Sequence, residues 1–128
     1  MALHWNISRR QRLVSMQAEG AVRLSDLEAF LHALASENAF AYSKLFDAQR
    51  GFTGMSESDV SIYAGMVSGF ATFSRFGPCA VIASRDSVAL HRPLIIQLML
   101  GKRPLGIFGE MDDAERWIWQ ARRAKQSH

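Results

Sequence analysis

The sequence contains a single cysteine, Cys79, so no disulfide bond can form within the chain. One thiol is typical of a protein kept in a reducing compartment. The segment from Met1 to Asn6 lacks a basic head followed by an apolar stretch, so no secretory signal is visible. No apolar run approaches the roughly 18 residues that a membrane span needs; the run 93–96, for example, is interrupted by Gln97. We therefore expect a cytoplasmic protein without a membrane span.

Residue sets typical of catalysis or metal binding are also missing. A zinc site needs several Cys or His residues at ligand spacing, and the histidines show no such spacing (His4, His32, His91 and His128). The segment 51–54 lacks the Gly-Lys-Ser/Thr ending of a phosphate-binding loop. No set of nucleophile, base and orienting group can be assembled. The sequence thus predicts a protein that is not an enzyme and that has no metal or cofactor.

The excess of positive charge is small and dispersed along the chain. The sequence has 15 Lys and Arg residues against 12 Asp and Glu residues, which gives a net charge of +3. Two short groups of cations stand near the termini, at 9–12 and 122–125, and the others are spread singly. Proteins that bind nucleic acid usually concentrate cations on one face and interleave them with aromatic residues. We therefore interpret the cations as solvated charges and expect no nucleic-acid partner.

The chain is long enough for one domain, residues 1–128, with a hydrophobic core. Its hydrophobic content of 48% is ordinary for a globular protein. Short apolar segments predict five strands, at Trp5–Ile7, Leu13–Ala18, Lys44–Asp47, Cys79–Ala83 and Leu105–Phe108. The polar turn between the first two strands is too short for a crossover connection, so these strands should form a hairpin.

Helical periodicity and capping residues predict four helices. Their expected bounds are Ser25 to Asn38, Ser56 or Ser58 to Phe76, Val88 or Pro93 to Gly101, and Asp112 onward. The first helix should open on a capping box formed by Ser25 and Glu28. In the third, Pro93 either begins the main helix or kinks it, because proline lacks the amide donor of a helix interior.

The expected order of elements is therefore β β α β α β α β α. Strands that are separated by helices must be parallel, with right-handed crossovers. The sequence predicts an α/β fold with a mixed, mostly parallel five-stranded sheet whose N-terminal strand is antiparallel. We expect one core to contain the following apolar residues: Leu34, Phe70, Val81, Ile82, Ile107 and Trp117.

Several parts of the chain together resemble a known domain type. They are the order of elements, Trp5 near the start, the strand–turn–helix segment 44–59, and Ile107–Ile118, which reads Ile-Phe-Gly-Glu-Met-Asp-Asp-Ala-Glu-Arg-Trp-Ile. This pattern is similar to the STAS-like, or SpoIIAA-like, group, the domain type of anti-sigma-factor antagonists and of the cytoplasmic tails of sulphate transporters. The resemblance covers nearly the whole chain. It implies a β–α superhelix with strands in near-sequential order and helices mainly on one face.

The resemblance also implies a phosphorylation candidate, Ser56. Anti-sigma-factor antagonists carry an Asp-Ser-Ser-Gly-like stretch at the start of the helix after the third strand, and the partner kinase phosphorylates one serine there. That position falls on 55–58, where Ser56 is the closest match, although the aspartate and the glycine are missing and Glu57 adds negative charge. From the residues alone, Ser56 or Ser58 is instead the N-cap of the helix, worth about 1 kcal/mol. We favour the cap and keep both serines as binding candidates.

Three charged residues complete the candidate binding site. Asp47 is predicted at the C-terminal end of a parallel strand, where ligands gather in open α/β sheets. Arg50 and Arg85 are predicted on loops at the same end. Either these residues contact a ligand or partner, or an ion pair of Asp47 with one of the arginines holds the loops. We favour the ion pair.

Two functions remain open. The first, which the resemblance implies, is a non-catalytic regulatory or protein-interaction module that acts through the loops from Asp47 to Ser58 and through the second helix. The alternative is a carrier of a small apolar ligand or lipid, to which the apolar third helix points. The second and third helices carry more apolar residues than one buried stripe needs, and exposed apolar patches mark association sites. We therefore expect a protein partner or a homodimer at that face.

Overall fold

A computed structural model of the protein describes residues 2–84 and 104–126. In chain order the elements are β1 (Leu3–Ser8), β2 (Leu13–Val22), α1 (Leu24–Ser36), β3 (Ser43–Thr53), α2 (Glu57–Phe73), β4 (Cys79–Ile82), β5 (Leu105–Phe108) and α4 (Met111–Gln126). The predicted third helix, from Val88 or Pro93 to Gly101, lies outside the described residues, as does Arg85.

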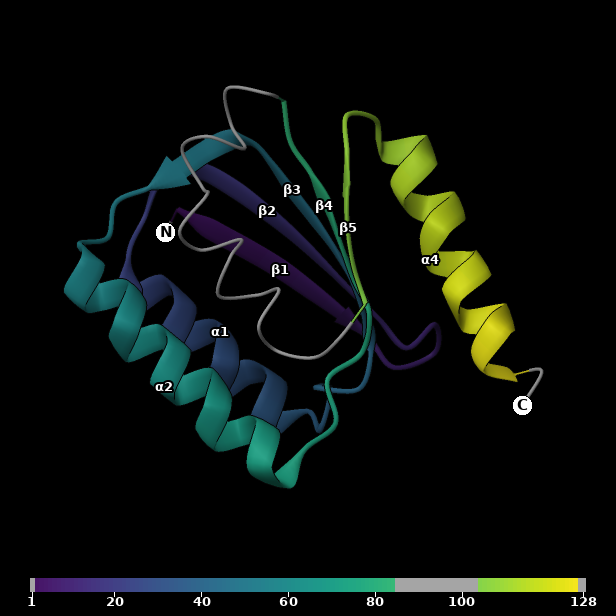
Figure 1. Cartoon of the computed structure of the whole chain (residues 1–128), viewed down its shortest axis with the longest axis horizontal. Helices are drawn as coiled ribbons and strands as arrows, with labels where there is room; N and C mark the ends of the chain where they lie inside the picture. The colour runs from purple at the N-terminus through teal and green to yellow at the C-terminus, as the bar shows by residue number, and fades with distance from the viewer. Residues whose placement is uncertain (1, 85–103, 127–128) are drawn as a thin grey trace.

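The five strands form one mixed sheet in the order β1-β2-β3-β4-β5 (Figure 1). Strands β1 and β2 pair antiparallel, and every other neighbouring pair is parallel. The hairpin, the five strands and their near-sequential order are therefore confirmed. The hairpin turn leaves β1 after Ser8 and includes Arg12, whose φ of 51° lies in the left-handed region.

Strands β2 and β3 are longer than the sequence pattern indicates. Strand β2 does not stop at Glu19-Gly20 but continues to Val22, with a bulge between Gln17 and Glu19 and a φ of 79° at Gly20. A glycine tolerates this conformation, so the residue expected to end the strand instead lets it continue. Strand β3 likewise runs on to Thr53, so placing Asp47 at its C-terminal end was wrong.

Hydrogen bonds donated by main-chain amides mark both ends of α1. The helix begins at Leu24, and the Asp26 carboxylate accepts a hydrogen bond of 2.9 Å from the Arg23 amide. The predicted Ser25–Glu28 capping box is therefore wrong, because the helix starts earlier. At the other end Asn38 has a φ of 53°. The amides of Asn38 and Ala39 donate to carbonyl groups of the last helical turn, which is the usual left-handed helix ending and confirms the predicted stop.

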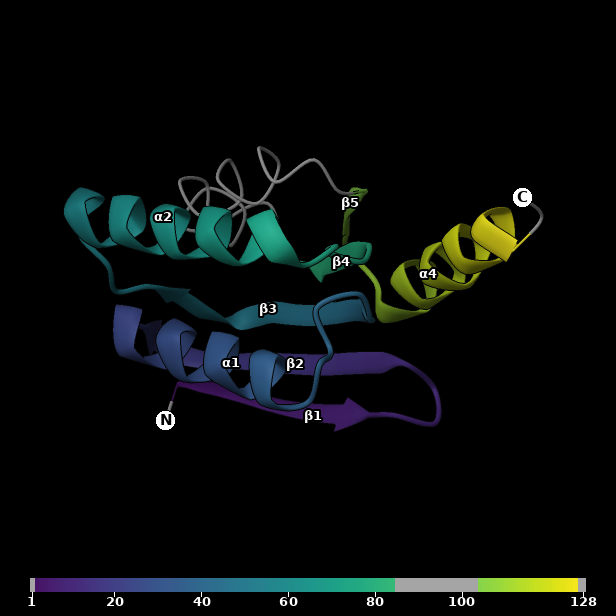
Figure 2. The same cartoon turned by 90° about the horizontal axis from the view of Figure 1, so that it is seen from below.

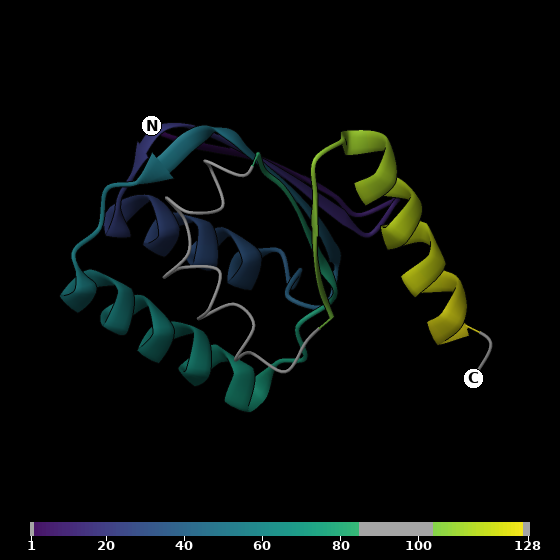
Figure 3. The ribbon, with the colours of Figure 1, turned by 45° about the horizontal axis from the view of Figure 1, so that its top comes forward.

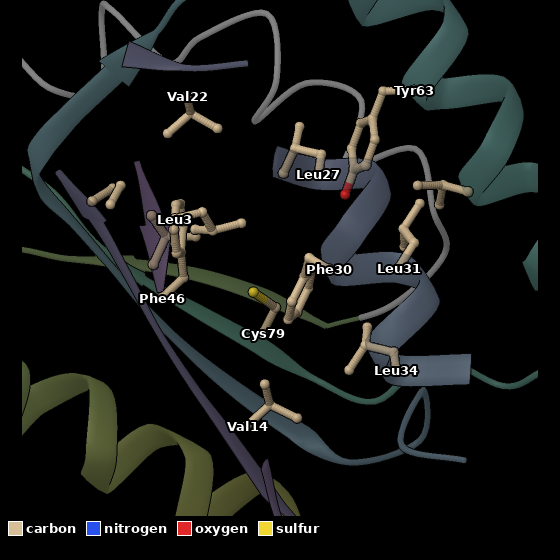
Figure 4. Packing of buried hydrophobic residues seen from close by; sticks show 14 of the residues in the cluster. Leu3, Val14, Val22, Leu27, Phe30, Leu31, Leu34, Phe46, Tyr63 and Cys79 are labelled. Carbon is tan, nitrogen blue, oxygen red and sulfur yellow. The ribbon is translucent and has the colours of Figure 1, made fainter. Parts of the chain in front are cut away.

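The sheet separates two hydrophobic cores. Helices α1 and α2 cover one face and α4 covers part of the other (Figure 3), so two of the three described helices share a face. The larger core joins that first face to both helices; Figure 4 shows Leu3, Val14, Phe46 and Cys79 of the sheet with Leu27, Phe30, Leu31 and Leu34 of α1 and Tyr63 of α2. The smaller core joins Leu45, Ala80 and Ile82 to Ala114 and Ile118 of α4.

The expectation of one shared core was wrong for a geometric reason. Successive side chains of a strand point to opposite faces of its sheet. Val81 therefore packs with α1 and α2, whereas its neighbour Ile82 packs with α4. Ile107 belongs to neither core and is 42% exposed.

Candidate functional site

Ser56 is the N-cap of α2. Its side-chain oxygen accepts a hydrogen bond of 3.1 Å from the Asp59 amide, and the Asp59 carboxylate accepts one of 3.3 Å from the Ser56 amide. This reciprocal capping box satisfies two amides that would otherwise lack an intrahelical acceptor. The predicted cap is confirmed at Ser56, while Ser58 lies one residue inside the helix. Both serine side chains are exposed.

The strand end that leads into α2 is also exposed. Arg50 faces solvent from the edge of the bulge, where it is in register with Glu19. Phe52 follows and is 44% exposed. The amide of Gly54 donates to the Val22 carbonyl at 2.8 Å, which fixes the turn to the end of β2. Arg50, Phe52, Ser56 and Ser58 are thus all exposed within the segment 50–58, which we call the β3–α2 surface.

Asp47 lies three residues before Arg50 on β3. It lies on the same side of β3 as Leu45, toward α4, and accepts a hydrogen bond of 3.1 Å from the Gln49 amide. With Gln17, Met111 and Glu115 it lines an open groove of about 350 Å³ between the first strands and the start of α4. Among the residues that the structure describes, no ion pair joins Asp47 to Arg50. Of the two ion pairs considered for Asp47, the one with Arg50 is therefore absent, and the one with Arg85 lies outside the described residues.

The burial of Lys44 was not predicted from the sequence. This side chain is 3% exposed, and its ammonium donates to the carbonyl oxygens of Phe40 at 2.7 Å and Tyr42 at 2.8 Å. The ammonium also lies 5.9 Å from the centre of the Phe76 ring. The sequence feature that could have indicated this burial is a lysine within the apolar run at the start of β3. These contacts hold the chain that leads into β3, which is a structural role.

Lys44 and Cys79 line a small cavity between the sheet and the two helices of its larger core. The cavity has a volume of about 40 Å³ and otherwise apolar walls that include Phe30, Phe46 and Tyr63. That is room for roughly one water molecule. The cavity therefore gives no support to the carrier alternative in the part of the chain that can be described, and Cys79 is buried as its strand position predicts.

The described residues contain neither a metal-binding cluster nor a helix suited to crossing a membrane. No cluster of three His, Cys, Asp or Glu residues with the geometry to hold a metal ion occurs among them. None of the helices in residues 2–84 and 104–126 has both the length and the apolar character to cross a membrane.

Two solved structures share the arrangement of strands and helices described above. An uncharacterized protein of the DUF3478 family from Shewanella loihica PV-4, described as having a SpoIIAA-like fold, superposes with a TM-score of 0.66 at 17% identity, covering 91% of this chain and 93% of that one. The fold is SpoIIAA-like. An anti-sigma factor antagonist from Mycobacterium paratuberculosis superposes with a TM-score of 0.53 at 14% identity, with the same coverage. No family model matches the sequence, and no curated protein matches it either.

Within the SpoIIAA-like fold, α2 is the helix that follows the third strand, and Ser56 stands at its start. This is where the resemblance placed the serine from the sequence. The structure therefore confirms that Ser56 is the N-cap of this helix.

Proposed function

We propose that this chain is a non-catalytic regulatory module that binds a protein partner through the β3–α2 surface. The observation that carries the proposal is the exposed, reciprocally capped Ser56 at the start of the helix after the third strand. The neighbour from M. paratuberculosis with the same fold is an anti-sigma factor antagonist, which supports a protein partner for this chain.

The chemistry of the β3–α2 surface supports the same proposal. Arginine and aromatic residues are enriched among those that dominate binding energies at protein interfaces, and the surface presents Arg50 beside the exposed Phe52. Ser56 and Ser58 add hydroxyl groups that can donate and accept hydrogen bonds. The underlying backbone is held by the capping box and by the Gly54–Val22 hydrogen bond, so a partner meets a preformed surface.

The groove that contains Asp47 is not part of the proposed interface. None of the residues 50–58, all of which the structure describes, lines this groove. We therefore assign partner binding to Arg50, Phe52, Ser56 and Ser58 and leave Asp47 outside the interface.

Site-specific photo-crosslinking in the native cells tests the proposal. A photoreactive phenylalanine analogue at Phe52 or at Ser58 should crosslink a discrete protein, and Arg50→Glu should reduce its yield several-fold because it reverses the charge of an interface arginine. The matched control is the same analogue at His32, an exposed position on α1. Equal crosslinking of the same protein from His32, or none from Phe52 and Ser58, would contradict the proposal.

A further inference from the structure

Two groups of arginines that stand near opposite ends of the sequence meet in the folded chain. The Arg122 guanidinium of α4 donates a hydrogen bond to the main-chain oxygen of Gln11 in the β1–β2 turn. Gln11 lies between Arg10 and Arg12, and the Cα atoms of consecutive residues are about 3.8 Å apart. Figure 2 shows the turn and α4 at the same end of the molecule. The cations are dispersed along the sequence but gathered in space.

These positive charges are not neutralised by ion pairs in the described residues. The ion pairs found there join Arg9 to Glu37 at 3.1 Å and Arg116 to Asp113 at 3.3 Å. Neither ion pair involves Arg122 or the exposed residues Arg10, Arg12 and Arg123. The Nη1 atom of Arg122 is buried without a hydrogen-bond partner in the described residues. The last acidic residue before Arg122 on α4 is Glu115. It stands seven residues earlier, which is roughly 10 Å along the helix axis.

An exposed aromatic ring lies beside Arg122. Trp119 is 47% exposed, and the guanidinium carbon of Arg122 lies 4.7 Å from the centre of its ring. The two planar groups thus form a cation–π pair at the surface. A base of a nucleic acid stacks on such a ring whatever its identity, while arginines bind the phosphates on either side.

The turn that carries Arg10 and Arg12 is held in place. The Ser43 amide donates to the Arg12 carbonyl at 3.2 Å, and the Gln11 amide donates to the Ser8 hydroxyl at 3.2 Å. With the contact from Arg122, the turn is fixed to β1, β3 and α4 together. A ligand therefore meets ordered main chain, which reduces the entropy lost on binding.

We propose that this basic end, formed by Arg10, Arg12, Trp119, Arg122 and Arg123, binds single-stranded nucleic acid. An acidic peptide would neutralise the arginines but carries no regular series of flat groups to stack on Trp119, whereas each nucleotide carries both a phosphate and a base. One tryptophan also offers little apolar area for insertion into a lipid surface. Several positive charges near one exposed aromatic ring are suited to a flexible polyanion whose bases can stack on that ring.

The basic end is separate from the β3–α2 surface. The Arg12 carbonyl contacts the first residue of β3, and Arg50 to Ser56 follow at the other end of this strand. At about 3.3 Å per residue the two surfaces lie roughly 30 Å apart. The inference is thus independent of the proposed protein partner, and variants of one surface can be tested without changing the other.

Fluorescence anisotropy of the full chain with labelled oligouridylate tests the proposal. Oligouridylate has little structure of its own and exposes its bases for stacking. Binding should weaken with salt, because each phosphate neutralised in a single strand contributes about −0.7 to the slope of log K against log salt concentration. The three exposed arginines, Arg10, Arg12 and Arg123, therefore predict a slope of about −2.1.

Three variants identify the surface. Arg10→Gln and Arg123→Gln should each make the slope shallower by about 0.7. Trp119→Leu keeps an apolar side chain but removes the ring, and should weaken binding about 5- to 150-fold. The matched control is Arg23→Gln, an exposed arginine at the far end of β2, which should change neither affinity nor slope. Circular dichroism establishes that each variant is folded.

Several results would overturn the proposal. One is the absence of oligouridylate binding by the wild-type chain at low salt. Another is an effect of Arg23→Gln as large as that of Arg10→Gln, which would indicate binding by overall charge alone. The last is a polyglutamate peptide, or anionic vesicles, binding more tightly than oligouridylate and losing affinity in Trp119→Leu. Such a result would assign the surface to an acidic protein or to a membrane, respectively.

Discussion

Gly51 of β3 lies so close to Ala18 of β2 that a side chain at position 51 would collide with Ala18. A Cβ atom built on Gly51 would lie 2.3 Å from the Cβ of Ala18 and 3.2 Å from its carbonyl carbon. The bulge between Gln17 and Glu19 lies at this point. The absence of a side chain at Gly51 therefore allows β3 to continue beside β2 toward the β3–α2 surface.

Gly51→Ala should destabilise the fold by about 1–3 kcal/mol, the usual effect of forcing atoms into a packed core. Chemical denaturation measures this change. The double variant Gly51→Ala with Ala18→Gly should recover part of the loss, because it removes the closer of the two atoms. If Gly51→Ala were as stable as the wild type, the pairing of β2 with β3 at this register would be wrong.

Two other glycines supply a matched control. Gly65 and Gly69 lie inside α2, and a Cβ on either would meet nothing within 4 Å. Gly65→Ala and Gly69→Ala should each stabilise the protein, by up to about 1 kcal/mol, because alanine favours the helix interior. The same substitution thus has opposite signs on β3 and on α2.

The Ser56 variants separate a capping role from a modification site. Ser56→Ala should lower the free energy of unfolding by about 1 kcal/mol, since the Asp59 amide loses its acceptor. Ser56→Asp should be nearly neutral, because aspartate caps as well as serine. A large loss of stability in Ser56→Asp would show that the capping geometry is wrong.

Phosphopeptide mapping of the native protein addresses the modification itself. A phosphate at Ser56 would add about −1.5 to −2 charge beside Glu57 and Asp59, although the helix N-terminus favours it. We expect Ser56 to be found unmodified. Detection of phosphoserine there would show that the residue is a switch as well as a cap.

Ile82 and Ile107 provide a pair of test positions on neighbouring strands. Ile82 is 1% exposed in the core beneath α4, whereas Ile107 is 42% exposed. Ile82→Ala should cost about 2–5 kcal/mol. Ile107→Ala should change stability by no more than about 0.5 kcal/mol. Thermal unfolding of both variants measures the difference, and equal losses would contradict the packing of the second core.

Self-association through α2 stays a prediction that rests on its exposed apolar side chains. Ile62 is 50% exposed and Phe73 is 90% exposed, and they stand three turns apart on one side of the helix. We expect a concentration-dependent dimer in sedimentation, and Phe73→Ser should abolish it without loss of stability. A wild-type chain that stays monomeric at high concentration would remove the dimer.

The sequence predicts most of this fold because local patterns and topology agree. The polar turn after Ser8 makes a hairpin unavoidable, and the helices between later strands make those strands parallel. Asn38 and Ser56 mark helix ends because their side chains suit those positions. Strand ends are less predictable, since Gly20 can either break a strand or let it bend and continue.

The candidate site was predicted only in part, because residues close in sequence were expected to be close in space. Asp47 and Arg50 are three residues apart, yet they form no ion pair with each other in the described residues. Conversely, Arg12 and Arg122 come to the same end of the molecule although they stand near opposite ends of the sequence. Only the register of the strands and the packing of α4 determine such neighbours.

Hydrogen–deuterium exchange of the chain with and without its crosslinked protein partner tests the proposed function most directly. Binding at the β3–α2 surface should slow exchange in residues 50–60, while the exposed side of α1 and the β1–β2 turn should exchange as in the free chain. Protection confined to α1, α4 or the β1–β2 turn, with unchanged exchange at 50–60, would contradict the assignment of this surface.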